Sequence, residues 1–80
     1  MSQEEVATNI VRIEALTYEQ ARDELVGVVS RLEAGGEPLE SALALWEQGE
    51  LLAQRCQQWL DGARARLEAV RAQSSADSED

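Results

Sequence analysis

The chain has 80 residues, 44% of them hydrophobic, so it is one small domain that buries little surface in a core of its own and is marginally stable without reinforcement. A single cysteine excludes an internal disulfide and the lack of histidine excludes the usual zinc sites, which leaves association with other chains as the reinforcement. The formal net charge of −9, from 16 acids against seven arginines, would be repelled by phosphate and argues against direct nucleic-acid binding as the main activity.

Residues 1–16 are too apolar for a typical disordered tail but carry no strong helix cap. We expect this N-terminal segment to be partly ordered at best and to become helical on contact with a partner. Its first residues, MSQEEVATN, place acids where a signal peptide has bases, and no apolar run in the chain approaches the roughly 20 residues that span a bilayer. The sequence therefore predicts a cytoplasmic protein with no membrane contact.

Residues 17–72 are predicted to form an antiparallel helical hairpin. Thr17 is the expected N-cap of a first helix over 18–34, with Gln20 as its capping-box partner. Gly35 and Gly36 should end that helix in a left-handed cap, and Pro38 suits the start of the next one. Apolar or small residues follow the helix with alternating spacings of three and four: Tyr18, Ala21, Leu25, Val28 and Leu32.

The second predicted helix covers about residues 39–71 and is followed by an acidic tail, residues 73–80, that we expect to be disordered. Its residues repeat the same alternation over more than four heptads. The predicted seam consists of Leu39, Ala42, Trp46, Gly49, Ala53, Cys56, Leu60, Ala63, Leu67 and Val70.

The two predicted helices differ in length, at roughly 25 Å and 50 Å for 1.5 Å per residue. The first should therefore cover the second only to about Cys56, leaving the apolar residues beyond it for another chain. A second apolar stripe, Leu45, Leu52 and Trp59, widens the face enough to touch two neighbours, so we expect a helical bundle larger than one hairpin. Gly49 within the seam predicts a close helix approach, with a flexible point as the alternative.

The candidate chemical groups form no catalytic pattern. Cys56 lies among apolar seam positions with no histidine to activate it, so an inert core cysteine is favoured over a nucleophile. The acids fall on outward positions and are better explained as a solvated face than as a metal site. Tyr18, Trp46 and Trp59 could stack on bases, but their seam positions favour packing. We expect no catalytic residue, no metal and no cofactor on this chain.

On this framework, the residues resemble the small subunit family of exonuclease VII over about residues 17–67. The resemblance rests on Tyr18-Glu19-Gln20-Ala21, on Arg31-Leu32-Glu33 before Gly35, and on the phrase LALWEQGELLAQRCQ, which sets an aromatic, a glycine and a cysteine at fixed spacing. Glu37 and Pro38 depart from the apolar residue and the serine or threonine cap usual in that family, and residues 1–16 have no counterpart.

The resemblance implies an accessory role. In that family a large subunit carries the nuclease site and degrades single-stranded DNA from either end into oligonucleotides, while several small subunits bind each large one. It implies that this chain binds the large subunit, associates with other small subunits and meets single-stranded DNA only through the complex. The predicted partner interface is Leu45, Leu52, Trp59, Leu60, Ala63 and Leu67.

Two alternatives remain open at this stage. The same amphipathic pattern would serve a generic helical adaptor or oligomerisation module for another cytosolic enzyme. A self-sufficient nucleic-acid-binding hairpin would use Trp59 and the late arginines, and would bind single-stranded DNA in a strongly salt-dependent way.

Overall fold

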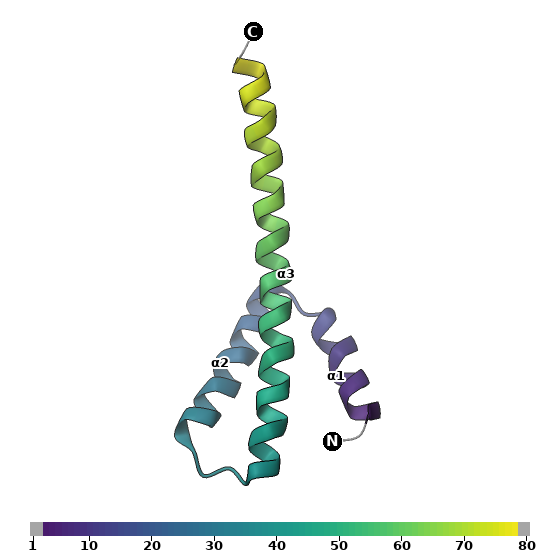
Figure 1. The fold of residues 1–80 in the computed structure, drawn as a ribbon, viewed down its shortest axis with the longest axis vertical. Coiled ribbons are helices and arrows are strands. Elements are labelled where there is room, and N and C mark those ends of the chain that lie inside the picture. Colours follow the sequence, from purple (N-terminus) through teal and green to yellow (C-terminus); the bar gives the residue numbers. More distant parts are fainter. Residues whose placement is uncertain (1–2, 79–80) are drawn as a thin grey trace.

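The computed structural model describes residues 3–78, which form three helices (Figure 1). Helix α1 spans Gln3–Glu14, α2 spans Tyr18–Ala34 and α3 spans Leu39–Ser78. α2 folds back along the first half of α3, α1 flanks the same half, and the rest of α3 extends alone (Figure 1). The all-α class is confirmed, and the molecule is elongated, with extents of 64 × 28 × 15 Å.

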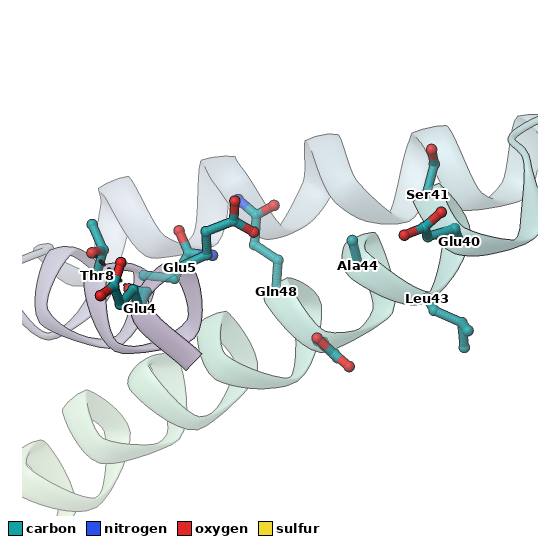
Figure 2. Close-up of a pocket in the computed structure, with 10 residues that line it drawn as sticks. Glu4, Glu5, Thr8, Glu40, Ser41, Leu43, Ala44 and Gln48 are labelled. Carbon is teal, nitrogen blue, oxygen red and sulfur yellow. Dashed lines mark hydrogen bonds between the residues drawn. The ribbon is translucent and has the colours of Figure 1, made fainter. Parts of the chain in front are cut away.

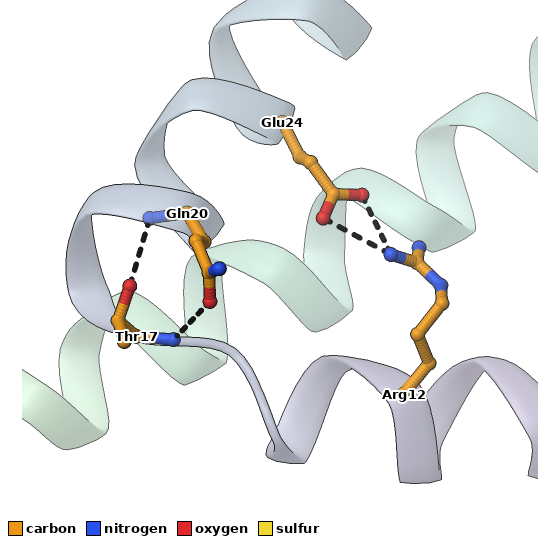
Figure 3. A network of polar contacts seen from close by, with 4 residues as sticks. All are labelled: Arg12, Thr17, Gln20 and Glu24. Atoms are coloured by element: carbon orange, nitrogen blue, oxygen red, sulfur yellow. Dashed lines mark hydrogen bonds and ion pairs between the residues drawn. The ribbon is translucent and has the colours of Figure 1, made fainter.

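The start of α2 is fixed by the predicted capping box (Figure 3). The Thr17 hydroxyl accepts a hydrogen bond from the Gln20 backbone N–H at 3.2 Å, and the Gln20 side-chain oxygen accepts one from the Thr17 N–H at 2.9 Å. Two backbone donors that a helix start leaves without partners are thereby satisfied. The local sequence alone determines this boundary.

The turn between α2 and α3 requires glycine, although not in the conformation expected. Gly35 has φ 71° and ψ −170°, outside the left-handed helical region that the sequence predicted and in a region that is essentially restricted to glycine. Gly36 also has a positive φ, 81°. Arg31 and Glu37 form an ion pair of 2.8 Å across the turn, and the Pro38 carbonyl accepts from the Ala42 N–H as α3 begins.

Gly35→Ala is expected to lower the free energy of unfolding by about 1–2 kcal/mol, because an added Cβ is strained at this positive φ. Gly27→Ala is the matched control: Gly27 lies inside α2, and no atom of a neighbouring group is within 4 Å of the place that its added methyl group would take, so this change should raise stability by up to about 1 kcal/mol. Urea denaturation followed by circular dichroism measures both. Equal effects of the same sign would contradict the assignment of the turn.

The core is small and draws on all three helices. Its buried side chains are Ile13, Ala21, Val28, Leu45 and Leu52. Leu16, Leu25, Leu32, Leu51 and Cys56 pack against them and are half-buried. The core therefore ends at Cys56, the level at which the sequence predicted that α2 would stop covering α3.

The face that α3 buries differs from the predicted seam. Leu45 and Leu52, assigned by the sequence to a second stripe, are 6% and 0% exposed, whereas the predicted seam residue Trp46 is 62% exposed. Ala42, Gly49 and Cys56 are shared by both patterns and are half-buried. The buried face is rotated towards Leu45 and Leu52 because α3 has neighbours on two sides, α2 and α1, and the wide apolar face predicted to touch two neighbours does so within this chain.

Both ends of the chain are more helical than expected. Gln3–Glu14 is a helix with acids in its first turn and Arg12 in its last, as the helix dipole favours, and Ile13 is 2% exposed. The expected partner for the N-terminal segment is therefore α3 of the same chain. α3 also continues past the predicted end at 71 to Ser78, since residues 72–78 contain no glycine or proline to stop it. The last two residues of the predicted tail lie outside the described residues.

Candidate functional site

Among the side chains that the structure describes, those of residues 3–75, no group of three or more Cys, Asp or Glu is placed to hold a metal ion. Cys56 is half-buried against the apolar core. A groove of about 830 Å³ lies between α1 and α3, and four of its lining residues are glutamates (Figure 2). These are Glu4, Glu5, Glu40 and Glu47.

Helix α1 is attached to the rest of the chain near its C-terminal end, away from the glutamates of this groove. Like charges on both of its walls repel each other, which disfavours close contact between the start of α1 and α3. Two residues near the end of α1 make its contacts. Ile13 is buried in the core, and Arg12 donates hydrogen bonds to both Glu24 carboxylate oxygens at 2.8 and 3.0 Å (Figure 3). Both partners of this ion pair are partly exposed, so it contributes little beyond about 1 kcal/mol.

A polar corner marks the point where α3 leaves the other helices. The Leu16 carbonyl oxygen accepts two hydrogen bonds, from the Trp59 indole N–H at 3.1 Å and from Arg55 Nε at 3.2 Å. The Arg55 guanidinium also lies over the Trp59 ring, 4.9 Å from its centroid. The α1–α2 connection is thus fastened to α3 at this level. Neither the use of a backbone carbonyl nor the pairing of Arg55 with Trp59 could be read from the sequence.

Beyond this corner, residues 59–75 form a helical segment that we call distal α3, and its apolar side chains are exposed. Trp59 is 42% exposed and Leu67 64% exposed. One side of distal α3 continues the buried face of the first half, and we call it the Trp59 face. It comprises Trp59, Ala63, Arg66 and Val70, spaced by four, three and four residues. A groove of about 330 Å³ lies on it, lined by Arg55, Gln58, Trp59, Gly62, Ala63 and Arg66.

The six residues of the predicted partner interface do not lie on one surface in the structure. Leu45 and Leu52 are core residues covered by this chain, so they are withdrawn from the interface. Trp59 and Ala63 lie together on the Trp59 face. Leu60 and Leu67 are also exposed, but each residue of a helix is rotated by about 100° from the next, so Leu60 lies on a different side from Trp59.

Leu60 and Leu67 belong to a second surface, which the sequence analysis assigned to the hairpin seam. Every seventh residue of α3 from Leu39 to Leu67 is apolar and exposed, and we call this row the leucine stripe. It consists of Leu39, Trp46, Ala53, Leu60 and Leu67. The seven-residue spacing was visible in the sequence, but the side of the helix that α2 would leave uncovered was not.

No helix in the described part of the chain is both long enough and apolar enough to cross a membrane.

The chain is similar to known proteins over most of its length. Residues 18–69 match the family model described as the exonuclease VII small subunit. A protein named exodeoxyribonuclease 7 small subunit from Arthrobacter sp. (strain FB24) is 62% identical over 66 residues, covering 82% of this chain and 87% of the relative. Proteins of the same name from Streptomyces coelicolor and Nocardia farcinica are 67% identical (84% of this chain, 75% of the relative) and 53% identical (85% and 87%).

No solved structure matches the chain significantly. The family match begins at the first residue of α2 and ends within distal α3, so it contains the hairpin, the polar residues Arg55 and Trp59 and most of the Trp59 face, and it leaves α1 outside. The length and identity of these matches confirm the resemblance seen in the sequence, and the chain belongs to the exonuclease VII small subunit family.

Proposed function

We propose that this chain is the non-catalytic small subunit of an exonuclease VII and that it binds the large catalytic subunit through the Trp59 face of distal α3. The large subunit would degrade single-stranded DNA to oligonucleotides, and this chain would meet DNA only within the complex. The cytoplasmic location expected from the sequence is part of the same proposal.

The observation that carries the proposal is the apolar Trp59 face left uncovered by the rest of the chain. Apolar surface excluded from water stabilises an assembly by about 25 cal/mol per Å², and Trp59 and Val70 together present a large area to a partner. Tryptophan and arginine are the residues most often found at the energetic centre of interfaces, and Arg55, Trp59 and Arg66 line the groove on this face. Family membership supports the identity of the partner.

Ala63→Glu is the variant that tests the proposal, because it places a charge at the centre of the Trp59 face. Ala65→Glu is its matched control: the same substitution two residues on, about 200° around the helix and also exposed. Each full-length variant is co-expressed with an affinity-tagged large subunit. We expect Ala63→Glu to reduce the recovered small subunit and the single-strand exonuclease activity at least about tenfold, as burying an unpaired charge costs several kcal/mol, and Ala65→Glu to leave both unchanged.

Circular dichroism of the isolated variants separates loss of binding from loss of folding, since both alanines are exposed and neither change should reduce helicity. Wild-type recovery and activity of Ala63→Glu would refute this binding face. Failure of the wild-type chain to co-purify with any large nuclease subunit would refute the function itself and favour the adaptor alternative.

A further inference from the structure

We propose that a second copy of this chain packs antiparallel along the leucine stripe of α3. The stripe runs from Leu39 to Leu67, a distance of about 42 Å along the helix, and all five of its side chains are exposed. An exact seven-residue repeat of apolar residues is the pattern by which two helices stay in contact over several turns. The proposal is independent of the large subunit, which we assigned to a different face.

The row of residues beside the stripe carries the charge pattern that selects the partner. Gly49 on one side of the stripe faces α2, since a Cβ there would lie 3.3 Å from Val28 Cγ1. The row on the other side, four residues after each stripe position, is free of α2. In order it contains Leu43, Glu50, Gln57, Arg64 and Arg71. Its negative charge lies towards the start of α3 and its positive charges lie towards the end.

The charges of this row attract those of the same row in a second copy only when the two helices are antiparallel. With a two-fold axis near Gln57, Glu50 of one copy lies level with Arg64 of the other, and Leu43 lies level with the long aliphatic stem of Arg71. The same axis sets Trp46 beside Leu67 and Ala53 beside Leu60, so large residues meet smaller ones. In a parallel, in-register pair the rows of the two copies would lie on opposite sides of the stripe, and Glu50 would be about 21 Å along the helix from Arg64 of the other copy, so the two charges could not pair.

The charges concerned are available for such a contact. Among the described side chains of residues 3–75, Glu50 and Arg71 form no ion pair. Arg64 pairs with Glu68 at 3.4 Å, but both side chains are mostly exposed and such a pair contributes little.

The overall distribution of charge and the length of the helices favour the same arrangement. Residues 1–54 contain eleven acids and three arginines, whereas residues 55–71 contain two acids and four arginines. α2 covers only the first half of α3 (Figure 1). An antiparallel second copy lays the arginine-rich distal α3 of each chain beside the acidic hairpin of the other, so that both uncovered halves gain a neighbour of opposite charge.

The test is the self-association of the isolated full-length chain, measured by sedimentation equilibrium at low salt. We expect a dimer for the wild type, about tenfold weaker association for Glu50→Arg or Arg64→Glu alone, and recovery to within about threefold in the double variant Glu50→Arg/Arg64→Glu. Glu14→Arg on α1 and Arg66→Glu on the Trp59 face make the same changes in net charge away from the stripe and should have little effect. A monomeric wild type, or single variants that match their controls, would overturn the proposal.

Orientation is tested separately by cross-linking in a Cys56→Ser background. Chains carrying Leu43→Cys are mixed with chains carrying Arg71→Cys and oxidised. The antiparallel pair predicts that the mixed disulfide is the main product, since both positions are exposed and lie level across the axis. A parallel pair places positions 43 and 71 about 42 Å apart along the helix and cannot form this disulfide, so absence of the mixed product would overturn the arrangement.

Discussion

Leu52→Ala is expected to lower the free energy of unfolding by about 2–5 kcal/mol, the range for removing a fully buried leucine. Leu52 is 0% exposed and is the largest fully buried side chain among residues 3–75, whose side chains the structure describes. A domain of this length has a total stability on the order of 4–12 kcal/mol. The melting temperature should therefore fall by about 10 °C or more, and part of the population should be unfolded at 37 °C.

Leu43→Ala is the matched control, because it removes the same atoms from the same helix at a position that is more than half exposed. Its effect should stay within about 0.5 kcal/mol. Both variants are compared by thermal and urea denaturation at one protein concentration, because association would make the apparent stability concentration-dependent. A Leu52→Ala effect as small as that of Leu43→Ala would mean that Leu52 faces outwards and that α3 buries the seam predicted from the sequence instead.

Gly49→Leu is expected to destabilise the chain by about 3 kcal/mol, near the upper end of the range for overpacking. A Cβ at Gly49 would already lie 3.3 Å from Val28 Cγ1 and 3.9 Å from Leu25 Cδ1, and the three further carbons of leucine have no room between α2 and α3. The helices would have to separate, which opens the core around Val28. This cost exceeds the roughly 1 kcal/mol that leucine contributes through its better helix propensity.

Gly62→Leu provides the control, since Gly62 lies in the same helix with no other side chain within 4 Å of its Cβ position. That change should stabilise the helix by up to about 1 kcal/mol. The sign of the difference, measured by urea denaturation, decides between close packing and a flexible point at Gly49. Stabilisation by both leucines would establish the flexible point.

Each of the two exposed apolar surfaces is assigned to a different proposed partner. The Trp59 face continues the buried face of the first half of α3, and the leucine stripe lies on another side of the helix. The Glu50/Arg64 reversals address a second copy, because their row lies on the side of the stripe away from the Trp59 face. Ala63→Glu addresses the large subunit, and its self-association is measured as well, because Ala63 lies three residues after Leu60 and four before Leu67. Both surfaces are proposed as contact sites because they are apolar and left exposed by the rest of the chain.

Local sequence was sufficient for several elements. The all-α class, the capping box at Thr17 and Gln20, the boundaries of α2 and the start of α3 each depend on a few neighbouring residues, and all are found in the structure. The level at which the core ends, near Cys56, also followed from the unequal helix lengths. The family could be named from the sequence because its characteristic residues lie within a single helix.

The tertiary structure decided the rest, because a heptad pattern fixes a spacing but not which side of the helix is covered. Two overlapping rows on α3 shared Ala42, Gly49 and Cys56, and the packing of both α1 and α2 against α3 determined that Leu45 and Leu52, rather than Trp46, complete the core. α1 itself is held by contacts distant in sequence, from Ile13 to α3 and from Arg55 and Trp59 to the Leu16 carbonyl. The sequence by itself thus determined the helices and their lengths, whereas long-range packing determined which apolar faces they leave for partners.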